Sequence, residues 1–535
     1  MRRPRRLRRG VLLPEGDVLT RTAEHRAAPG AIDAGEEGRP QGGGDAASGS
    51  AVARNAFYLT LGQAATTALA IVMSAAVGRS LGAQDFGLYY LVSAMSAFAY
   101  VFVEWGQSLF VMRMVAREPA RAGEFLGTAL AMRSAFAAIT TLPVGAIAWV
   151  LGYGARTTWL AMAFILSTLP VFLAQGYGMV FRARDRMGRD ATVSVANKVV
   201  ALAAMLPALA LGAGIPGIIG AQAVAGLAAL AVASRLYRRL GAPALRLSRA
   251  TARELLAGGT PITVMTAASA IHPYFDAIIL SKLASPVSVG WYGAAKTVLG
   301  TLMAPAVILG QASYPRVARA SGELASLRVA VRAALRPLLW LAALGGTGTY
   351  LFAPTVIGLI YGRGDFGPAA TILQIFAPGL FLLFVDILLG NIIYASGGGI
   401  GFAVAKIVSV GIAALLDVLL IPWFQTHHGN GGIGVVVAYA LSEVAVFVGA
   451  LIVLRRGTLG AGAALDVARA LAAAAATLAL FHLLPALPAW AGIPLCVGAF
   501  TAASAALGLV NRKDLEMLRL ALRRREAPAA PDEPS

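Results

Sequence analysis

Nine charged side chains that interrupt long apolar runs are the residues of this sequence that could do chemistry. Four are basic and five are acidic: Arg133, Lys198, Lys296, Lys406, Glu104, Asp276, Asp386, Asp417 and Glu443. A charge within a long apolar run is costly, so such residues usually face a polar cavity or one another. They are therefore the candidates for binding an ionic ligand or for carrying an ion.

The four bases suit an anionic ligand that carries phosphate. Arg binds phosphate oxygens as a fork, and Lys acts as a point charge. Their distance from the nearest loop places Arg133, Lys198 and Lys406 in the half of each run that is expected to face the cytoplasm. We hypothesise that these three bind substrate by lining an inward-facing cationic vestibule, and that Lys296 lies farther along the path as a waypoint.

The acids allow a second interpretation of the same residues. Pairing by depth gives three structural ion pairs: Glu104–Arg133, Asp276–Lys296 and Asp386–Lys406. Lys198 has no acid at its level, and it is then the best single candidate for binding substrate.

Two further acids, Asp417 and Glu443, are expected to face each other across two consecutive runs near the end of the chain. One proton shared between buried carboxylates costs less than two buried charges. The pair could therefore bind a coupling proton or Na⁺. The alternative is a protonated pair that only holds neighbouring helices together.

The sequence offers little else that resembles a catalytic or metal site. The single Cys496 excludes a disulfide framework within the chain. His427 and His428 lie in a Gly-rich stretch and indicate a solvated turn. The Gly-rich stretch 30–44 lacks the Lys of a phosphate-binding loop. We find no nucleophile–base motif either, and we expect no metal, no cofactor and no enzymatic activity.

The composition is that of a polytopic membrane protein. Of the 535 residues, 58% are hydrophobic and only 13% are charged, which is roughly half the charged fraction of a soluble domain. The net charge of +19 could indicate nucleic-acid binding. The basic residues fall between the apolar runs, however, where they set membrane topology, so we expect no nucleic-acid partner.

Fourteen apolar runs are long enough to cross a bilayer as helices, which predicts an all-α fold. They cover about residues 57–78, 88–112, 125–151, 159–181, 191–212, 215–234, 260–281, 289–311, 337–361, 368–395, 400–424, 433–454, 464–484 and 490–510. The remaining ends are polar: residues 1–50 read as a disordered basic tail that could touch anionic lipid, and residues 512–535 as a second tail.

The loops between the runs carry their Lys and Arg residues asymmetrically. With the N-terminus in the cytoplasm, 27 of them fall in cytoplasmic loops and 4 in the opposite loops. The positive-inside rule then predicts a multi-pass protein of the bacterial cell membrane with both termini in the cytoplasm.

Two loop motifs recur six runs later in the chain. A Gly-x-Tyr sequence begins at Gly87 before the second run and again at Gly290 before the eighth. Gly217 and Gly434 mark a second pair of matching turns, before the sixth and twelfth runs. Because six is an even number, the two copies share one orientation in the membrane. Such parallel repeats occur in transporters whose substrate lies between two lobes that rock around it.

The duplication divides the chain into six predicted parts. They are a tail (1–50), an N-terminal lobe, here lobe one (51–240), a cytoplasmic linker (241–259), a C-terminal lobe, here lobe two (260–456), two further helices (457–511) and a tail (512–535).

Three short motifs carry a resemblance to a known family. They are Leu81-Gly82-x-x-Asp85-Phe86-Gly87-x-Tyr89 in the first external loop, Tyr314-Pro315-Arg316, and Tyr361-Gly362-x-x-Asp365-Phe366. Together with twelve duplicated helices, two additional helices and two cytoplasmic termini, these motifs resemble the polysaccharide flippases. These form the oligosaccharidyl-lipid branch of the multidrug/oligosaccharidyl-lipid/polysaccharide exporter superfamily. The resemblance covers about residues 52–510.

The resemblance implies a fold and a function. The expected fold is two pseudo-symmetric six-helix lobes in a V around a central cavity, plus two C-terminal helices. The expected activity is to move an undecaprenyl-pyrophosphate-linked oligosaccharide from the inner to the outer leaflet, for O-antigen, capsule or exopolysaccharide biosynthesis. Expected partners are this lipid-linked oligosaccharide, membrane lipids, and a polysaccharide polymerase or glycosyltransferases.

Two other functions are less well supported by the sequence. A multidrug or cation antiporter of the same superfamily would concentrate acids in lobe one, where Glu104 is the only acid within a run. A membrane glycosyltransferase or polymerase would carry catalytic residues in a long external loop. The external loops of this chain reach only about ten residues, so we favour the flippase.

Overall fold

The computed structural model describes residues 43–485 and 487–510, without the side chains of 43–60, 265 and 268–273. Most of both predicted tails therefore lies outside the described residues. Residues 43–50, at the end of the first predicted tail, form the start of a helix. Ala53–Ser535 form one compact unit, and the description below concerns the described part of that unit.

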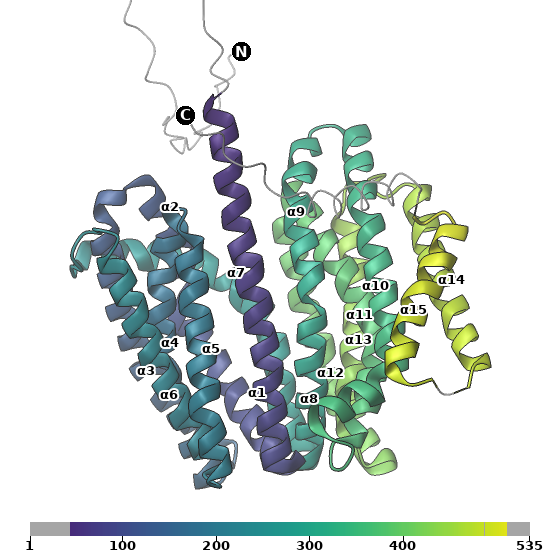
Figure 1. The fold of residues 1–535 in the computed structure, drawn as a ribbon, viewed down its shortest axis with the longest axis horizontal. Coiled ribbons are helices and arrows are strands. Elements are labelled where there is room, and N and C mark those ends of the chain that lie inside the picture. Colours follow the sequence, from purple (N-terminus) through teal and green to yellow (C-terminus); the bar gives the residue numbers. More distant parts are fainter. Residues whose placement is uncertain (1–42, 486, 511–535) are drawn as a thin grey trace, which may run out of the picture. The chain divides into compact units, whose positions relative to one another are not determined.

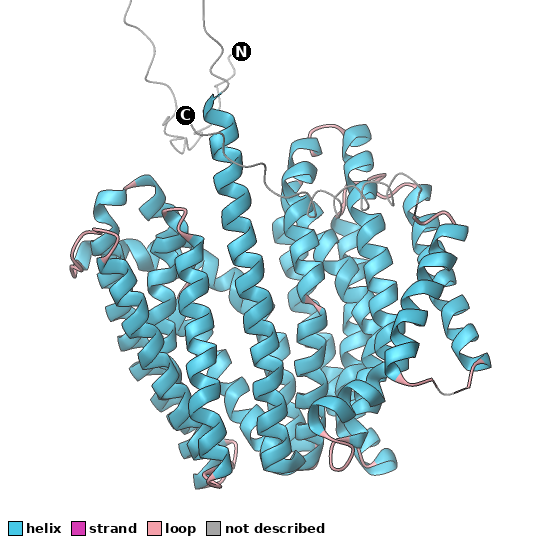
Figure 2. Ribbon diagram, viewed as in Figure 1, coloured by secondary structure: helices cyan, strands magenta, loops and turns pink. Residues whose placement is uncertain are grey.

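The described residues form helices and no strands (Figure 2). The helices are α1 (Gly43–Glu104), α2 (Gln107–Arg117), α3 (Ala122–Val150), α4 (Ala155–Ala183), α5 (Met187–Ala210), α6 (Gly214–Arg238), α7 (Arg249–Leu283), α8 (Pro286–Leu302), α9 (Ala304–Ala320), α10 (Leu324–Tyr361), α11 (Gly367–Ala395), α12 (Gly399–His428), α13 (Gly431–Val453), α14 (Ala461–Leu483) and α15 (Ala489–Ala506), with a 3₁₀ turn at Pro119–Arg121 (Figure 1). The all-α prediction is confirmed.

Twelve helical segments of the described chain are long and apolar enough to cross a membrane. One of them, Leu61–Arg117, is 57 residues long and contains a non-helical Gly82 (φ 70°) that separates two helices. This break falls between the first two predicted runs. The helix α7, which contains the seventh predicted run, is not among the twelve segments. The count of fourteen spans therefore stays a prediction.

The helices of lobe one pack in an order that recurs in lobe two. In lobe one, α3 packs on α4, α4 on α6, and α5 on α6. In lobe two, α10 packs on α11, α11 on α13, and α12 on α13. The shorter helices follow the same rule, because α2 packs on α4 and α9 packs on α11. This recurrence supports the duplication inferred from the two Gly-x-Tyr sequences.

Each lobe also contains one interrupted helix at a corresponding place. The second predicted run breaks at Trp105 (φ 44°) and Gly106 (φ 64°), where α1 ends and α2 begins. The eighth breaks at Met303, between α8 and α9, two residues before Pro305. Proline cannot donate the backbone hydrogen bond that a continuous helix needs. At Gly106 a side chain would meet the carbonyl oxygen of Gly259, so the break belongs to a close contact with α7.

The helix α7 contacts both lobes. Its first half packs on α2 and α3, where Leu255 is buried in the core of lobe one. Its second half packs on α8, α12 and α13, and Ser281 and Lys282 at its end bond to Tyr153 and Leu151 of lobe one. Because α7 begins at Arg249, it includes part of the segment that the sequence assigned to a linker (241–259).

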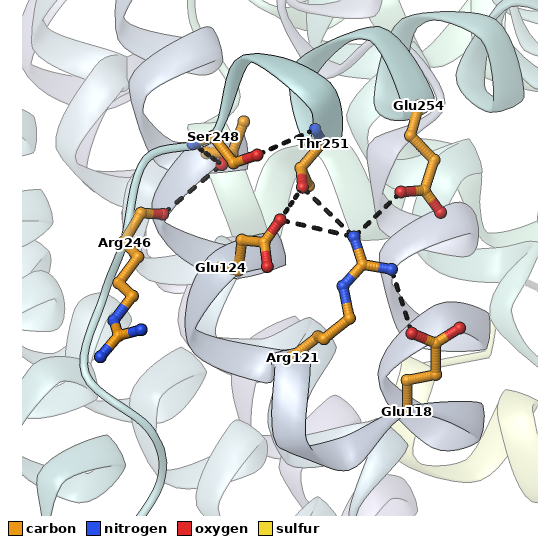
Figure 3. Close-up of polar contacts among 8 residues, drawn as sticks. Glu118, Arg121, Glu124, Arg246, Ser248, Thr251 and Glu254 are labelled. Carbon is orange, nitrogen blue, oxygen red and sulfur yellow. Dashed lines mark hydrogen bonds and ion pairs between the residues drawn. The ribbon is translucent and has the colours of Figure 1, made fainter.

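A polar cluster fixes the start of α7 to the start of α3 (Figure 3). Ser248 caps α7 by accepting a hydrogen bond from the Thr251 amide at 3.2 Å. The Arg121 guanidinium binds three carboxylates: Glu118 at 3.0 Å, Glu124 at 3.4 Å and Glu254 at 3.1 Å. The Thr251 hydroxyl donates a further bond to Glu124. One arginine thus ties α7 to lobe one.

The two Gly-x-Tyr sequences of the repeat meet each other. A β-carbon added at Gly290 would lie 1.9 Å from the carbonyl oxygen of Ala83, and one added at Gly87 would lie 2.4 Å from that of Pro286. The backbones therefore approach closely at the place where α1 of lobe one packs on α8 of lobe two. Glycine is required at both positions because any side chain would separate them.

Aromatic rings surround this glycine contact. The Phe86 ring packs edge-on against Tyr361 at 5.6 Å and Phe366 at 5.5 Å between centroids. The Tyr361 hydroxyl also shares a hydrogen bond of 2.6 Å with Ser74. Two of the three motifs that carried the family resemblance, Leu81–Tyr89 and Tyr361–Phe366, thus join the lobes at one end.

We predict that Gly290→Ala destabilises the protein by roughly 1–3 kcal/mol, because overpacking a close contact costs about that much. Thermal unfolding of the purified protein in detergent measures the effect. Gly300→Ala is the matched control, since it lies in the same helix and a β-carbon there meets nothing within 4 Å. Equal stability of the two variants would contradict the close contact.

Candidate functional site

Lobe two holds a buried cluster of charges around Lys296. Its ammonium group on α8 lies 3.7 Å from a carboxylate oxygen of Asp276 on α7. The same oxygen accepts a hydrogen bond of 2.9 Å from the Tyr292 hydroxyl. Rings of Tyr439, Phe376 and Tyr292 lie 4.7, 5.5 and 5.6 Å from the ammonium nitrogen, within the range of cation–π attraction. Lys296 is therefore enclosed by one carboxylate and three rings.

A second ion pair joins α11 and α12 in the same lobe. The Lys406 ammonium lies 2.6 Å from Asp386, and both side chains are largely buried. Sequence depth predicted this pair and the Asp276–Lys296 pair as the alternative to substrate binding. The structure brings the partners of both pairs together.

Within the spans of lobe two, four acids face two lysines. Asp417 on α12 and Glu443 on α13 are buried, and no salt bridge to either is found in the described part of the chain. Asp417 interacts electrostatically with Asp276 and Lys296, whereas Glu443 interacts with Lys406, Asp386 and Lys296. Both acids thus act on Lys296, and the expectation that they face each other as a pair stays a prediction.

Several carboxylate oxygens in this cluster lack partners. The Oδ1 atoms of Asp386 and Asp417 and the Oε2 atom of Glu443 are buried without a hydrogen-bond partner among the described residues. A buried carboxylate without a partner is costly when it is ionised. Four acids around two lysines can therefore lower their free energy by taking up protons or a cation.

In lobe one, the buried Arg133 is bonded to uncharged groups instead of to a carboxylate. Arg133 on α3 is 1% exposed, and its guanidinium donates to Gln107 at 3.2 Å, to the Phe172 carbonyl oxygen at 2.7 Å and to Ser108 at 3.2 Å. Glu104 instead accepts a bond of 3.1 Å from the Ser108 amide. The Glu104–Arg133 ion pair is absent from the described residues, and Arg133 is held by neutral oxygens.

Lys198 lies in a cavity of about 430 Å³ between α1, α4, α5 and α6. The cavity extends along α5 from Asp190 in its first turn to Met205 near its end. Lys198 makes no hydrogen bond or ion pair with any described residue. Of the four predicted substrate-binding bases, it alone lines this cavity, and Arg133, Lys296 and Lys406 do not.

Uncharged polar side chains complete the cavity wall. Four amides line it: Gln63, Gln175, Asn197 and Gln222. Gln222 donates a hydrogen bond of 2.5 Å to Thr168, and Asp190 is bonded to Arg182 at 2.9 Å. We did not predict the amides, because only ionisable residues were considered as candidates. The sequence does contain a signal for them: Gln and Asn within apolar runs usually face the interior of a helical bundle.

The fold resembles that of solved membrane transporters. The chain is similar to the lipid II flippase MurJ in an inward closed conformation (13% identity, 85% of this chain and 99% of that chain covered, TM-score 0.66). It is also similar to an inward-facing multidrug resistance MATE family transporter (16%, 72% and 93%, TM-score 0.59) and to a mutant of the MATE transporter VcmN from Vibrio cholerae (15%, 77% and 99%, TM-score 0.54). At these identities the likeness shows the fold, which is that of a multi-pass membrane protein of the transporter type.

The sequence of residues 52–321 matches a family described as polysaccharide biosynthesis protein. The match covers half of the chain, and the protein belongs to this family. The resemblance drawn from the Gly-rich motifs is therefore confirmed. No protein with a curated description matches the chain.

We predict that the Asp386–Lys406 pair is structural. Lys406→Met alone should destabilise the protein by roughly 3 kcal/mol, because removing one partner leaves a buried charge uncompensated. The double variant Lys406→Met/Asp386→Leu should recover most of that loss. Thermal unfolding of the three proteins in detergent tests this, and a double variant no more stable than Lys406→Met would refute it.

Proposed function

We propose that this protein flips a polyprenyl-pyrophosphate-linked oligosaccharide from the cytoplasmic to the outer leaflet of the bacterial cell membrane. The flipped oligosaccharide then serves O-antigen, capsule or exopolysaccharide biosynthesis. Membership of the polysaccharide biosynthesis family supports the pathway. A fold of the transporter type supports movement across the membrane rather than chemistry on the sugar.

The observation that carries the proposal is the composition of the lobe-one cavity. Amide side chains such as Gln63, Gln175 and Asn197 both donate and accept hydrogen bonds, which is what sugar hydroxyls require. Lys198 adds a single positive charge with no partner among the described residues. Amides that bond sugar hydroxyls, beside one lysine that has no ion pair among the described residues, suit a sugar attached to a phosphate.

The direction of transport follows from the two ends of the molecule. The loop charges predict that the turns at Gly87 and Gly290 are external, and these turns pack tightly together. The cavity reaches toward Asp190 at the start of α5, which the same charges assign to the cytoplasmic side. Cargo would therefore enter from the cytoplasm, and the glycine contact would have to open for release.

The surplus acids of lobe two supply a means of coupling. Asp417 and Glu443 are buried beside lysines that already have other carboxylate partners. A proton or Na⁺ that binds there would change the charge of lobe two without occupying the cavity of lobe one. We therefore assign cargo to lobe one and the coupling ion to lobe two, with alternating access linking them.

Lys198→Ala is expected to reduce flipping at least about tenfold, which corresponds to roughly 1.4 kcal/mol of lost phosphate interaction. Flipping of a lipid-linked oligosaccharide in proteoliposomes measures this, with protein amount and melting temperature held as checks. Lys198→Arg is the matched control and should retain most activity because it keeps the charge. Full flipping by Lys198→Ala would remove the phosphate role, and drug resistance conferred by the wild type without any flipping would favour the antiporter.

Glu443→Gln is expected to weaken the response of flipping to an imposed pH or Na⁺ gradient, because the amide keeps the size of the side chain but cannot release a proton. Binding of cargo should remain unchanged, since Glu443 lies in the other lobe. Flipping assays with and without each gradient distinguish the two ions. An unaltered gradient response in Glu443→Gln would exclude this acid from coupling.

A further inference from the structure

Three arginines on one face of α10 attach the last two helices to lobe two. Arg328, Arg332 and Arg336 are four residues apart, so they project from the same side of the helix. Arg328 donates to the carbonyl oxygen of Gly457, before α14. Arg336 donates to the carbonyl oxygen of Gly508, just after α15, at 2.5 Å. The helices α14 and α15 lie beside α10 at this edge (Figure 1, yellow).

Asp466 on α14 is the acid at the centre of this contact. It is fully buried and accepts bonds of 2.7 and 3.2 Å from Arg332 and of 3.3 Å from Arg469. Arg336 adds an ion-pair contact at 3.8 Å. One carboxylate and the carbonyl end of α15 thus oppose three guanidinium groups, so the cluster keeps a net positive charge.

An open cavity of about 570 Å³ adjoins the cluster. It is lined by Val329, Arg332, Ala333, Arg336, Arg469 and Gly508. The side chains of Arg332 and Arg469 are 46% and 29% exposed. The Nε atom of Arg336 is buried and has no hydrogen-bond partner among the described residues. Three guanidinium groups that share one carboxylate therefore line this space, and each can donate more hydrogen bonds than Asp466 and the Gly508 carbonyl accept.

The position of the cavity relative to the bilayer identifies its ligand. With 38 residues, α10 is about 57 Å long, whereas the hydrocarbon core is about 30 Å thick. The arginines lie near the start of α10, which the loop charges assign to the cytoplasmic side, so they fall where the helix enters the membrane. Val329 at the rim is 65% exposed, which gives the mouth an apolar side that acyl chains could follow.

We propose that the arginine cavity between α10, α14 and α15 binds the phosphate of an anionic phospholipid from the cytoplasmic leaflet. Arginine forks match phosphate oxygens, and basic pockets between membrane helices on the cytoplasmic side favour anionic headgroups. The bound lipid would hold α14 and α15 against lobe two. This proposal does not depend on the cargo of the transporter.

Native mass spectrometry of the full-length protein tests the proposal, with phosphatidylglycerol and phosphatidylcholine offered in turn. The wild type should prefer phosphatidylglycerol. Arg336→Gln/Arg469→Gln should lose at least about tenfold of that binding, given the contribution of each basic residue near an anionic leaflet, while the Arg332–Asp466 bond remains. Arg336→Lys/Arg469→Lys, which keeps the charge, should bind more tightly than the Gln variant.

The matched control is Arg238→Gln/Arg239→Gln, which removes the same charge from two exposed residues at the end of α6. It should bind phosphatidylglycerol as the wild type does. Equal loss in this control, or unchanged binding in the Gln variant, would overturn the site. If the Gln variant does not fold, Arg469→Gln alone must weaken binding or the proposal fails. Stabilisation of the wild type by millimolar inorganic phosphate, to the same degree as by phosphatidylglycerol, would overturn the assignment to lipid.

Discussion

The cost of an unpaired charge within apolar helices governs how both lobes are built. Lobe two meets this cost with partners of opposite sign, at Lys296–Asp276 and Lys406–Asp386. Lobe one surrounds Arg133 with neutral oxygens instead. Among the described residues, lobe one is then left with Lys198 unpaired in a polar cavity, and lobe two with more buried acids than lysines within its spans. Under the proposed function, this difference assigns the anionic cargo to lobe one and the coupling cation to lobe two.

The helix α7 and the breaks in its neighbouring helices connect the interior of lobe one with the interior of lobe two. The helix α7 contacts both lobes and is tied to the start of α3 by the Arg121–Glu254 ion pair. It also carries Asp276, so a change of charge beside Lys296 acts on a helix that contacts both lobes. The interruptions at Gly106 and Met303 lie in the helices that α7 contacts. Segments that end within the bundle can turn as short rigid pieces, which a continuous span cannot do.

The sequence was sufficient for the helical class, the family and the repeat, because hydropathy and the Gly-x-Tyr spacing report on them directly. Depth within the spans also predicted the partners of Lys296 and Lys406. Depth did not predict the partners of Arg133, because Gln107 and Ser108 accept its hydrogen bonds in place of Glu104. Depth along a span does not say which side of the helix a residue faces. The cavity around Lys198 could not be predicted, since Gln175 and Gln222 come from different helices and meet only through packing. The helix α7 begins at Arg249, within the segment predicted as a linker, because a polar helix end has the same composition as a linker.

The contact between Gly87 and Gly290 has the form of an isologous interface. In a two-fold dimer, residue i of one copy contacts residue j of the other, and j contacts i in turn; here Gly87 meets Pro286 and Gly290 meets Ala83 within a single chain. The contact is therefore reciprocal: a larger residue at either glycine would press on a backbone carbonyl of the other repeat, so neither position can be enlarged without displacing the backbone opposite it.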